Sequence, residues 1–502
     1  MKKLFSLFLV LCMLMSLTGA FAESADAEAP AEAAAPAEEA LSVTQHSVRL
    51  GRQTLNYIAT AGRMPVSVED DHCDMFFTAY TLDGVKDPTQ RPITFAFNGG
   101  PGASSEWLHM GMLAPRKVET DENGQPTQLP GRIVDNPCSI LDMTDLVFID
   151  PVGTGYSRVS EGTDPNAFYS YAMDIASMSE FIRLYTTRNG RWGSPKYLAG
   201  ESYGTTRAVG VANYLSNNYA LGLNGLMLVS TANDFSTLMM SETTFDLSYV
   251  LYLPSYAAIG QYHGLLEEPY QSMPLEELIA EARDFAATEY QTALFKGSRL
   301  DDAEKDAVAE KVAALTGLKQ DFVRKNNLRV HLVGFCENLL AEKKLMVGRL
   351  DARYTGPVTE GDLGAGDSDP SFAALGDLFG TAVNQYIGGE LDYHTDLTYE
   401  TMSGAVNASW SFGLDNQILL QEEDIYNAMS HNRFLKVWVL CGYYDLATPF
   451  GCAEYVYDHV FLNPETRQNL SFTYYPSGHM IYMHAPSLEQ FRKDAEAWYR
   501  EK

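Results

Sequence analysis

The sequence GESYG at residues 200–204 lies directly after a short apolar run, residues 197–199, and directly before a helix-forming stretch that begins near Thr206. Small residues on both sides of Ser202 allow the sharp strand-to-helix turn that exposes a serine hydroxyl above the edge of a sheet. The N-terminus of the following helix favours negative charge that develops there. An ordinary glycine-bounded turn has the same pattern, so the choice between the two depends on residues elsewhere in the chain.

Short apolar runs rich in β-favouring residues and bounded by turn residues recur along the chain and predict buried strands. They cover residues 76–81, 93–97, 146–150, 197–199, 226–231, 437–440 and 472–475. Helix-forming stretches, residues 171–185 and 206–215, separate the middle runs. Strands that alternate with helices in this way predict an α/β fold with a central, mainly parallel sheet.

Between about residues 234 and 432 the sequence changes character. It becomes a series of long charged and alanine-rich helical segments, such as residues 274–289 and 302–316. A structureless loop of that length inside a compact domain is implausible, so this block is predicted to be an inserted helical cap with its own packing. The α/β core is then predicted in two parts, residues 41–233 and 433–502.

The N-terminal residues predict export. In residues 1–22, two lysines precede an apolar run from residue 4 to residue 17, and the segment closes with a small-x-small cleavage site, as in a secretory signal peptide. A membrane anchor is the competing interpretation, but the run is shorter than the roughly 20 apolar residues of a bilayer span. Residues 23–40, rich in Ala, Glu and Pro, predict a disordered tether. The mature chain is therefore expected outside the cytoplasm, secreted or in the cell envelope, with no membrane span.

Composition excludes some functions and limits others. The 502 residues carry a formal net charge of −29, a field that repels phosphate backbones, so nucleic-acid binding is not expected. Of the six cysteines, five remain after signal cleavage without CxxC spacing, and at most two disulfides of undetermined pairing are expected. The sequence contains no HExxH, Walker A or GxGxxG motif, so neither a metal nor a nucleotide cofactor is expected.

A serine is a weak nucleophile unless a base and a residue that orients the base accompany it. Asp445 follows the predicted strand 437–440 in the sequence VLCGYYD, and His479 follows the predicted strand 472–475 in YPSGHM. Both residues therefore lie just beyond the carboxyl end of a strand, where an open α/β sheet collects its active site. We predict a catalytic triad of Ser202, Asp445 and His479.

The sequence NGGPGASS at residues 98–105 follows the predicted strand 93–97. Glycines at this turn allow a close backbone approach. The amides of Gly100 and Tyr203 are therefore predicted to converge on the oxyanion of a tetrahedral intermediate. A tight turn that caps a helix from Ser104 is the alternative.

These motifs, together with IDPVGTGYS at residues 149–157, resemble the serine carboxypeptidase family of α/β-hydrolases, in order from about residue 57 to the C-terminus. The segments WLHMGMLAPRKV and GRLDARYTG are more similar to its bacterial secreted members. The resemblance implies an α/β-hydrolase fold and a secreted enzyme that removes residues from peptide C-termini through an acyl-enzyme. It also implies that Asn98, Gly99 and Glu201 bind the free C-terminal carboxylate of the substrate. Glu201 can donate a hydrogen bond to a carboxylate only when protonated, so binding should favour acid.

Three positions depart from the family pattern. Met112 stands where the family has a second glutamate, so the acidic pair is missing and weaker carboxylate binding near neutrality is expected. Ala103 and Thr448 replace two family cysteines. Two alternatives stay open: an esterase or acyltransferase that uses the same triad, and a catalytically inactive peptide-binding protein.

Overall fold

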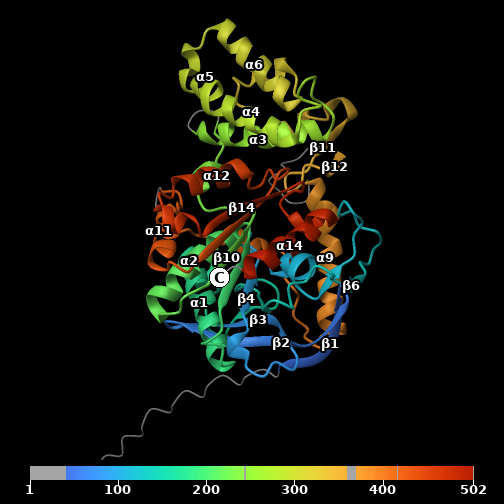
Figure 1. Cartoon of the computed structure of the whole chain (residues 1–502), viewed down its shortest axis with the longest axis vertical. Helices are drawn as coiled ribbons and strands as arrows, with labels where there is room; N and C mark the ends of the chain where they lie inside the picture. The colour runs from blue at the N-terminus through green and yellow to red at the C-terminus, as the bar shows by residue number, and fades with distance from the viewer. Residues whose placement is uncertain (1–40, 242–244, 359–368, 415–416, 501–502) are drawn as a thin grey trace, which may run out of the picture. The chain divides into compact units, whose positions relative to one another are not determined.

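The computed structural model describes residues 41–241, 245–358, 369–414 and 417–500 (Figure 1). The predicted signal peptide, residues 1–22, and the predicted tether, residues 23–40, lie outside the described residues. Over the described ranges, no helix has both the length and the apolar character that a membrane span requires.

A ten-stranded mixed sheet forms the centre of the fold. Its strands are β1 (Ser42–Leu50), β2 (Gln53–Val68), β3 (Asp71–Leu82), β4 (Ile93–Phe97), β7 (Asp145–Ile149), β8 (Arg158–Val159), β9 (Lys196–Glu201), β10 (Gly225–Val229), β13 (Lys436–Gly442) and β14 (Leu470–Tyr475). Their order across the sheet is β1-β2-β3-β7-β4-β9-β10-β13-β14, with β8 beside β3. The pairs from β1 to β7 are antiparallel, and the pairs from β7 to β14 are parallel. The mainly parallel sheet is as predicted, and each predicted run overlaps one of these strands.

Two long strands, β1 and β2, were not among the predicted runs. Exposed and buried positions alternate along β1, because this strand lies at the edge of the sheet with one side open to solvent. Its apolar content is therefore low, and no continuous apolar run marks it. The parallel strands β4, β7 and β9 are instead buried along their whole length, which is why continuous apolar runs identified them.

Helices cover both faces of the sheet. The flanking elements are α1 (Tyr171–Arg188), α2 (Tyr203–Tyr219), α9 (Pro370–Gly389), α14 (Ala485–Arg500) and the π-helical turn η2 (Leu108–Leu113). Leu198 and Leu228 pack with α1 and α2 in one hydrophobic cluster. Their chain neighbours Ala199 and Val229 point to the other face and pack with η2, α9 and α14 in a second cluster.

The predicted insertion lies between β10 and β13. Its elements are α3 (Leu247–Tyr262), α4 (Leu275–Phe285), α5 (Gln291–Lys296), α6 (Asp302–Thr316), α7 (Gln320–Lys325), α8 (Leu332–Asn338), β11 (Leu345–Val347), β12 (Thr355–Pro357), α9, α10 (Gly404–Ser409) and α11 (Glu422–His431). The chain also has a short strand pair, β5 (Arg116–Val118) and β6 (Ile133–Asp135), and two C-terminal helices, α12 (Phe450–His459) and α13 (Pro464–Arg467).

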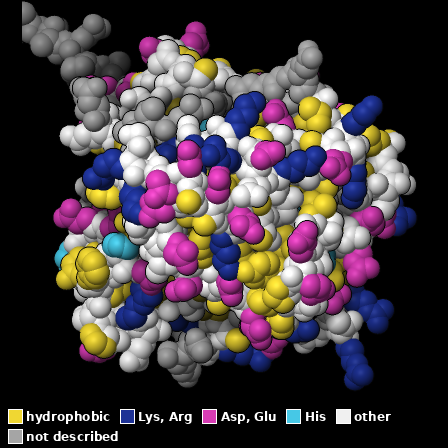
Figure 2. All heavy atoms as spheres, turned by 90° about the horizontal axis from the view of Figure 1, so that it is seen from above, with side chains coloured by type: hydrophobic (Ala, Val, Ile, Leu, Met, Phe, Trp, Pro, Cys, Tyr) yellow, Lys and Arg dark blue, Asp and Glu magenta, His cyan; other side chains and the backbone are white. Residues whose placement is uncertain are grey.

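The insertion is not uniform in its packing. Helices α3 to α8 pack mainly on one another, and Arg283 of α4 donates from Nε to Glu454 Oε2 of α12 (3.0 Å). Helix α9 instead packs on the sheet, and α11 packs on α2, where Asn213 Nδ2 donates to the Asp424 carbonyl (2.9 Å). Figure 2 shows acidic and basic side chains interspersed over one face of the molecule.

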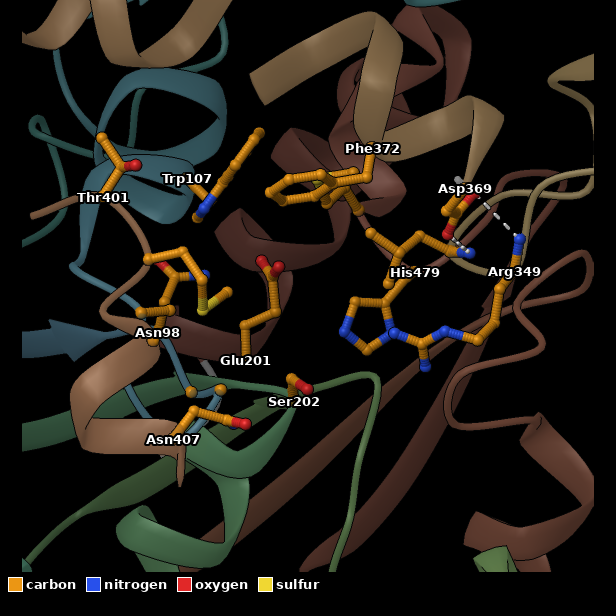
Figure 3. Close-up of a pocket in the computed structure, with 17 residues that line it drawn as sticks. Asn98, Trp107, Glu201, Ser202, Arg349, Asp369, Phe372, Thr401, Asn407 and His479 are labelled. Carbon is orange, nitrogen blue, oxygen red and sulfur yellow. Dashed lines mark hydrogen bonds between the residues drawn. The ribbon is translucent and has the colours of Figure 1, made fainter. Parts of the chain in front are cut away.

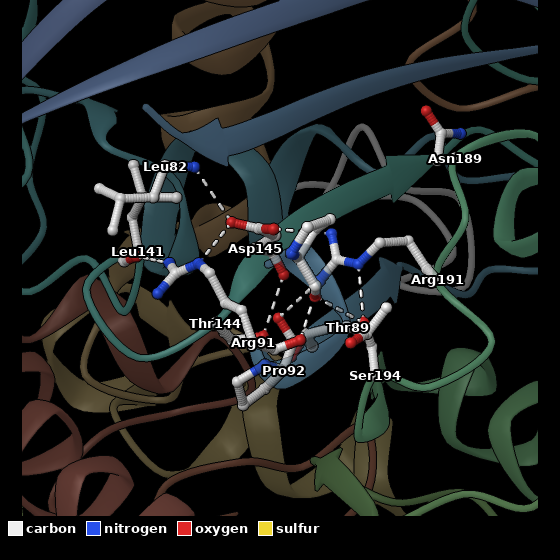
Figure 4. Close-up of polar contacts among 12 residues, drawn as sticks. Leu82, Thr89, Arg91, Pro92, Leu141, Thr144, Asp145, Asn189, Arg191 and Ser194 are labelled. Atoms are coloured by element: carbon white, nitrogen blue, oxygen red, sulfur yellow. Dashed lines mark hydrogen bonds and ion pairs between the residues drawn. The ribbon is translucent and has the colours of Figure 1, made fainter. Parts of the chain in front are cut away.

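A buried ion-pair network fixes the amino ends of three neighbouring strands (Figure 4). Asp145 at the start of β7 accepts from Arg91 Nε (2.6 Å) and the Leu82 amide (3.1 Å) on Oδ1, and from Arg191 Nη1 (2.7 Å) on Oδ2. Arg91 precedes β4, and Arg191 precedes β9. The network thus lies at the amino ends of the parallel strands. Active sites of open α/β sheets lie at the opposite, carboxyl ends of the strands.

All five cysteines that would remain after signal cleavage are described, buried and free. Burial raises the pKa of the Cys441 thiol well above its ordinary value, so this side chain behaves as a small apolar group. The sequence allowed at most two disulfides, and the described residues contain none.

Candidate active site

Ser202 occupies a strained turn between β9 and α2. Its backbone has φ 60° and ψ −130°, a conformation that residues other than glycine rarely adopt. Its amide donates to the Val229 carbonyl (3.0 Å). The turn is too tight for side chains at its flanks. A Cβ at Gly200 would lie 2.2 Å from the Gly204 carbonyl oxygen, and a Cβ at Gly204 would lie 2.8 Å from the Phe97 carbonyl oxygen. The two glycines of the GESYG sequence are therefore required by the turn that presents Ser202.

His479 and Asp445 form a buried pair after β14 and β13. Nδ1 of His479 lies 2.8 Å from Asp445 Oδ2, and both residues are almost inaccessible to solvent. Asp445 Oδ1 accepts from the amides of Ala447 (2.7 Å) and Thr448 (3.0 Å), and these two hydrogen bonds fix the orientation of the carboxylate toward the imidazole. With Nδ1 bonded to Asp445, Nε2 is the imidazole nitrogen that can accept a proton.

Burial and charge act against each other in this pair. Burial lowers the pKa of His479, but the Asp445 charge and hydrogen bond, together with Glu201, outweigh burial and raise the pKa above its ordinary value. Burial raises the pKa of Asp445, but His479 and the donors of Thr448 outweigh it, so the pKa is lowered. Asp445 is therefore a carboxylate that stabilises a cationic His479, the form needed when the base has taken a proton.

Thr448, which stands where the family has a cysteine, contacts both members of this pair. Its hydroxyl donates to Asp445 Oδ2 (2.8 Å), and its oxygen lies 3.2 Å from His479 Nδ1. The hydroxyl thus helps to hold the carboxylate in line with the imidazole. The sequence identified this position only as a departure from the family and gave no indication of the contact.

Replacement of Thr448 by valine should lower kcat/KM by about ten- to a hundredfold, because one hydrogen bond to a charged group, about 1.5–3 kcal/mol, is lost while the shape of the side chain is kept. The pKa of Asp445 should rise, since Thr448 now helps to lower it. Ester hydrolysis measured over a range of pH checks both effects. Thr448→Ser keeps the hydroxyl and should retain most of the activity; equal losses in the two variants would contradict the role of the hydroxyl.

Ser202, His479 and the predicted carboxylate-binding residues line one cavity of about 560 Å³ (Figure 3). The wall residues are Asn98, Gly99, Gly100, Ala103, Trp107, Glu201, Ser202, Arg349, Leu350, Asp369, Phe372, Thr401, Met402, Gly404, Asn407, His479 and Met480. Among the described residues, no hydrogen bond joins the Ser202 hydroxyl to His479; such contacts are often long in enzymes without substrate. Asp445 lies behind His479, outside the cavity wall.

Glu201 is a buried carboxyl group beside the nucleophile. Burial raises its pKa to about 7, against the opposing effect of His479. The Tyr482 hydroxyl donates to its Oε1 (3.3 Å). The sequence predicted no like-charged partner to raise this pKa, since Met112 replaces the second glutamate. Met112 is buried in η2, outside the cavity wall, and burial of Glu201 raises the pKa instead.

Asn98 is fixed from two sides. Its Oδ1 accepts from the Leu108 amide (3.0 Å), and its carbonyl accepts from Arg207, which is itself paired with Asp174 (2.8 Å from Nε to Oδ2). Since Oδ1 is occupied, Nδ2 is the donor that Asn98 can offer to a ligand. Figure 3 places Asn98 and Glu201 on the same side of His479.

The predicted oxyanion donors lie where the 98–105 turn contacts the Ser202 turn. A Cβ at Gly99 would lie 2.5 Å from the Tyr203 amide nitrogen, so the two backbones touch. Tyr203 is the first residue of α2, and its amide therefore has no acceptor within the helix. Gly100 has φ 100° and lines the cavity, whereas the Tyr203 side chain is buried and donates to Asp174 (3.1 Å).

Sequence reasoning missed the cavity residues that the insertion supplies. Arg349 lies in the GRLDARYTG stretch, and Asp369 and Phe372 belong to the start of α9. Trp107, which lies in the WLHMGM stretch outside the insertion, was missed as well. These stretches were noticed for their similarity to bacterial members, but nothing in their local pattern indicates that they face Ser202.

Comparison with known proteins finds similarity to serine carboxypeptidases. Residues 51–245 match the serine carboxypeptidase family. The resemblance that the motifs indicated is confirmed. Serine carboxypeptidase-like 2 of Arabidopsis thaliana is 27% identical over 179 residues, which are 34% of this chain and 38% of that protein. The pheromone-processing carboxypeptidase KEX1 of Fusarium vanettenii is 29% identical over 177 residues, 34% of this chain and 26% of that protein.

The matched region spans well under half the length of these curated relatives. In three dimensions the likeness is wider. The crystal structure of a prohormone-processing carboxypeptidase from Saccharomyces cerevisiae matches with a TM-score of 0.56 and 16% identity, and the match covers 88% of this chain and 91% of that one. The α/β-hydrolase fold implied by the resemblance is therefore confirmed.

Proposed function

We propose that this chain is a serine carboxypeptidase that removes single residues from the free C-termini of peptides. The observation that carries the proposal is the cavity in which Ser202 and His479 share one wall with Asn98 and the buried Glu201. A nucleophile with a base is common to many hydrolases. A buried acid that keeps its proton up to about pH 7 next to that nucleophile suits a ligand that brings a carboxylate of its own.

The reaction uses two acyl transfers. His479 takes the Ser202 proton on Nε2 while the Ser202 oxygen attacks the scissile carbonyl, and the amides of Gly100 and Tyr203 stabilise the oxyanion. The intermediate collapses as His479 returns the proton to the leaving amine, which releases the C-terminal residue and leaves an acyl-enzyme. Water, deprotonated by His479, then attacks the ester, and the shortened peptide leaves with a new carboxylate.

Recognition of the substrate C-terminus distinguishes a carboxypeptidase from other hydrolases that use the same catalytic triad. Protonated Glu201 and the Asn98 amide donate to the substrate carboxylate, with the Gly99 amide beside them. Burial supports this role because it keeps Glu201 uncharged at mildly acidic pH, where an ionised Glu201 would repel the ligand.

A matched pair of substrates tests the proposal. A blocked dipeptide with a free C-terminal carboxylate should be hydrolysed much faster than its C-terminal amide, since the amide lacks the charge that Asn98 and Glu201 receive. Equal rates on the two would favour a general esterase or amidase. Hydrolysis of neither, together with no labelling of Ser202 by a serine-reactive phosphonate, would leave a peptide-binding protein as the function.

Wild-type kcat/KM on the free-acid peptide should fall about tenfold per pH unit above pH 7, because Glu201 loses the proton it donates. Glu201→Gln donates from an amide at every pH, so its peptide activity should persist to higher pH. Ester activity should show no such fall above pH 7 in either protein, because an ester has no carboxylate for Glu201 to bind. Steady-state rates on peptide and ester over pH 5 to about 9 check these profiles.

The same variant changes the acid side of the profile. Glu201 contributes to the raised pKa of His479, so in Glu201→Gln the acid limb of ester hydrolysis should move to lower pH. Glu489→Gln, an exposed substitution on α14 with the same change in net charge, is the matched control and should shift neither limb. Identical peptide and ester profiles in wild type and Glu201→Gln would show that Glu201 does not receive the carboxylate.

We further propose that residues 1–22 direct export and are removed, so that the enzyme acts outside the cytoplasm. Sequencing the N-terminus of the protein recovered from its native location tests this, and a mature start at Glu23 is expected.

A further inference from the structure

Arg349 brings a positive charge into the active-site cavity, and the proposed mechanism does not use that charge. The residue follows β11 in the insertion, is partly buried and belongs to the cavity wall. In the view of Figure 3 its side chain extends toward His479, on the opposite side of the imidazole from Glu201 and Asn98. The charge of Arg349 acts on the pKa of His479, which it lowers, in agreement with this closeness.

The backbone around Arg349 is fixed to both loops of the triad. Asp369 accepts from the Arg349 amide on Oδ1 (3.1 Å) and from the Leu350 amide on Oδ2 (3.1 Å). The Arg349 carbonyl accepts from the amide of Leu446, next to Asp445 (3.0 Å), and the Leu350 carbonyl accepts from the His479 amide (2.7 Å). The position from which the Arg349 side chain extends is therefore as well defined as the triad.

Within the described ranges, the guanidinium of Arg349 has no hydrogen bond and no ion pair. Three other arginines with buried side chains each face a carboxylate at ion-pair distance: Arg207 with Asp174 (2.8 Å), Arg191 with Asp145 (2.7 Å) and Arg353 with Asp351 (2.6 Å). Arg349 thus keeps its planar set of five N–H donors for a ligand of the cavity.

Among the described residues, no acidic group of the cavity wall forms a hydrogen bond or an ion pair with the guanidinium of Arg349. Asp369 is occupied, since besides the two amides it accepts from the Ser371 amide (3.0 Å) and the Ser371 hydroxyl (2.5 Å) on Oδ1. Burial raises the pKa of Glu201 to about 7, so this group is mostly uncharged at mildly acidic pH. The N–H donors of Arg349 are then open to a negatively charged group of a ligand.

We propose that Arg349 selects peptides with an acidic side chain on one of the two residues that flank the scissile bond. The inference rests on the proposed function, in which Asn98 and Glu201 already receive the C-terminal carboxylate. A second carboxylate in the same ligand then meets the guanidinium, which can bind both of its oxygens. The test varies the residue before the scissile bond and the residue after it separately.

The test measures binding to the full chain that carries Ser202→Ala, so that turnover does not consume the ligand. The ligands are N-blocked dipeptides: Ala-Ala, Glu-Ala, Gln-Ala, Ala-Glu and Ala-Gln. At about pH 6 the Glu side chains are ionised and Glu201 is largely protonated. In at least one position, Glu should bind about tenfold or more tightly than Gln, as expected for a charge-assisted hydrogen bond, and added salt should reduce the difference.

Three second substitutions, each on the Ser202→Ala background, complete the test. Arg349→Gln should bring the Glu-to-Gln ratio close to one. Arg299→Gln, an exposed arginine of the insertion with the same charge change, should keep the ratio. For Arg349→Glu the blocked dipeptides Lys-Ala and Ala-Lys are added, and this variant should favour Lys over Gln at the responsive position.

The inference is overturned if Glu and Gln peptides bind equally at both positions, or if the preference survives in Arg349→Gln. It is also overturned if Arg349→Gln weakens Ala-Ala and the Glu peptides by the same factor, since Arg349 would then serve the C-terminal carboxylate or only the pKa of His479. Failure of the proposed function has a different result: the chain with Ser202 would cleave none of the five peptides, while the binding ratios could still follow Arg349.

Discussion

Ser202→Ala should reduce peptide and ester hydrolysis by about 10⁴- to 10⁶-fold, because the oxyanion donors remain but no acyl-enzyme can form. The fold should be unaffected. The Ser202 side chain donates no hydrogen bond among the described residues, and alanine keeps the Cβ that the strained turn already accommodates. Steady-state rates and thermal unfolding of the same preparations measure the two effects.

Ser216→Ala provides the matched control, because Ser216 is exposed on the same helix, α2. It should retain full activity. A fluorescent phosphonate should label wild type and Ser216→Ala but leave Ser202→Ala unlabelled. If more than a few per cent of the activity remains in Ser202→Ala, another residue is the nucleophile.

Asp445→Asn is expected to cost about 10³- to 10⁴-fold in kcat. The carboxylate accepts from two backbone amides, the Thr448 hydroxyl and His479, and an amide cannot accept at all of these positions. His479 therefore loses the partner that fixes Nδ1–H. Its pKa should fall, since the Asp445 charge now raises it, and the acid limb of the residual ester activity should move to lower pH.

Asp458→Asn tests whether loss of one acidic charge is itself damaging. Asp458 is an exposed residue of α12 whose carboxylate meets Arg467 at the surface (2.9 Å). This variant should be fully active. An Asp445→Asn protein with a wild-type acid limb would contradict the role assigned to Asp445.

The sequence identified the triad candidates because each of them follows an apolar run that predicts a strand. The runs before Ser202 and Asp445 are the buried strands β9 and β13. The run before His479 was also predicted to be buried, but β14 is an edge strand and only partly buried. Arg349 has no such marker. It reaches the cavity because its loop is held to the His479 loop, with Gly478 donating to Asp351 Oδ2 (3.2 Å), a contact between segments more than a hundred residues apart.

Helix α9 illustrates the same limit. Its residues lie in the stretch predicted as a separate cap, and its composition is that of any apolar helix. Tyr386 of α9 instead meets strand β3, where the Tyr80 hydroxyl donates to the Tyr386 hydroxyl (3.0 Å), and Phe379 belongs to the same hydrophobic cluster on this face of the sheet. Asp369 at its N-cap accepts from the Ser371 amide, and this cap position brings Asp369 next to Arg349. No local pattern distinguishes a helix that covers the sheet from one that packs within an insertion.

The most direct test of the central claim is mass spectrometry of one unblocked peptide of mixed sequence after incubation with the pure mature chain at mildly acidic pH. The account predicts products shortened one residue at a time from the C-terminus, with the N-terminus intact and with the C-terminally amidated peptide uncut. Products that have lost N-terminal residues, or that arise from internal cleavage, would contradict it.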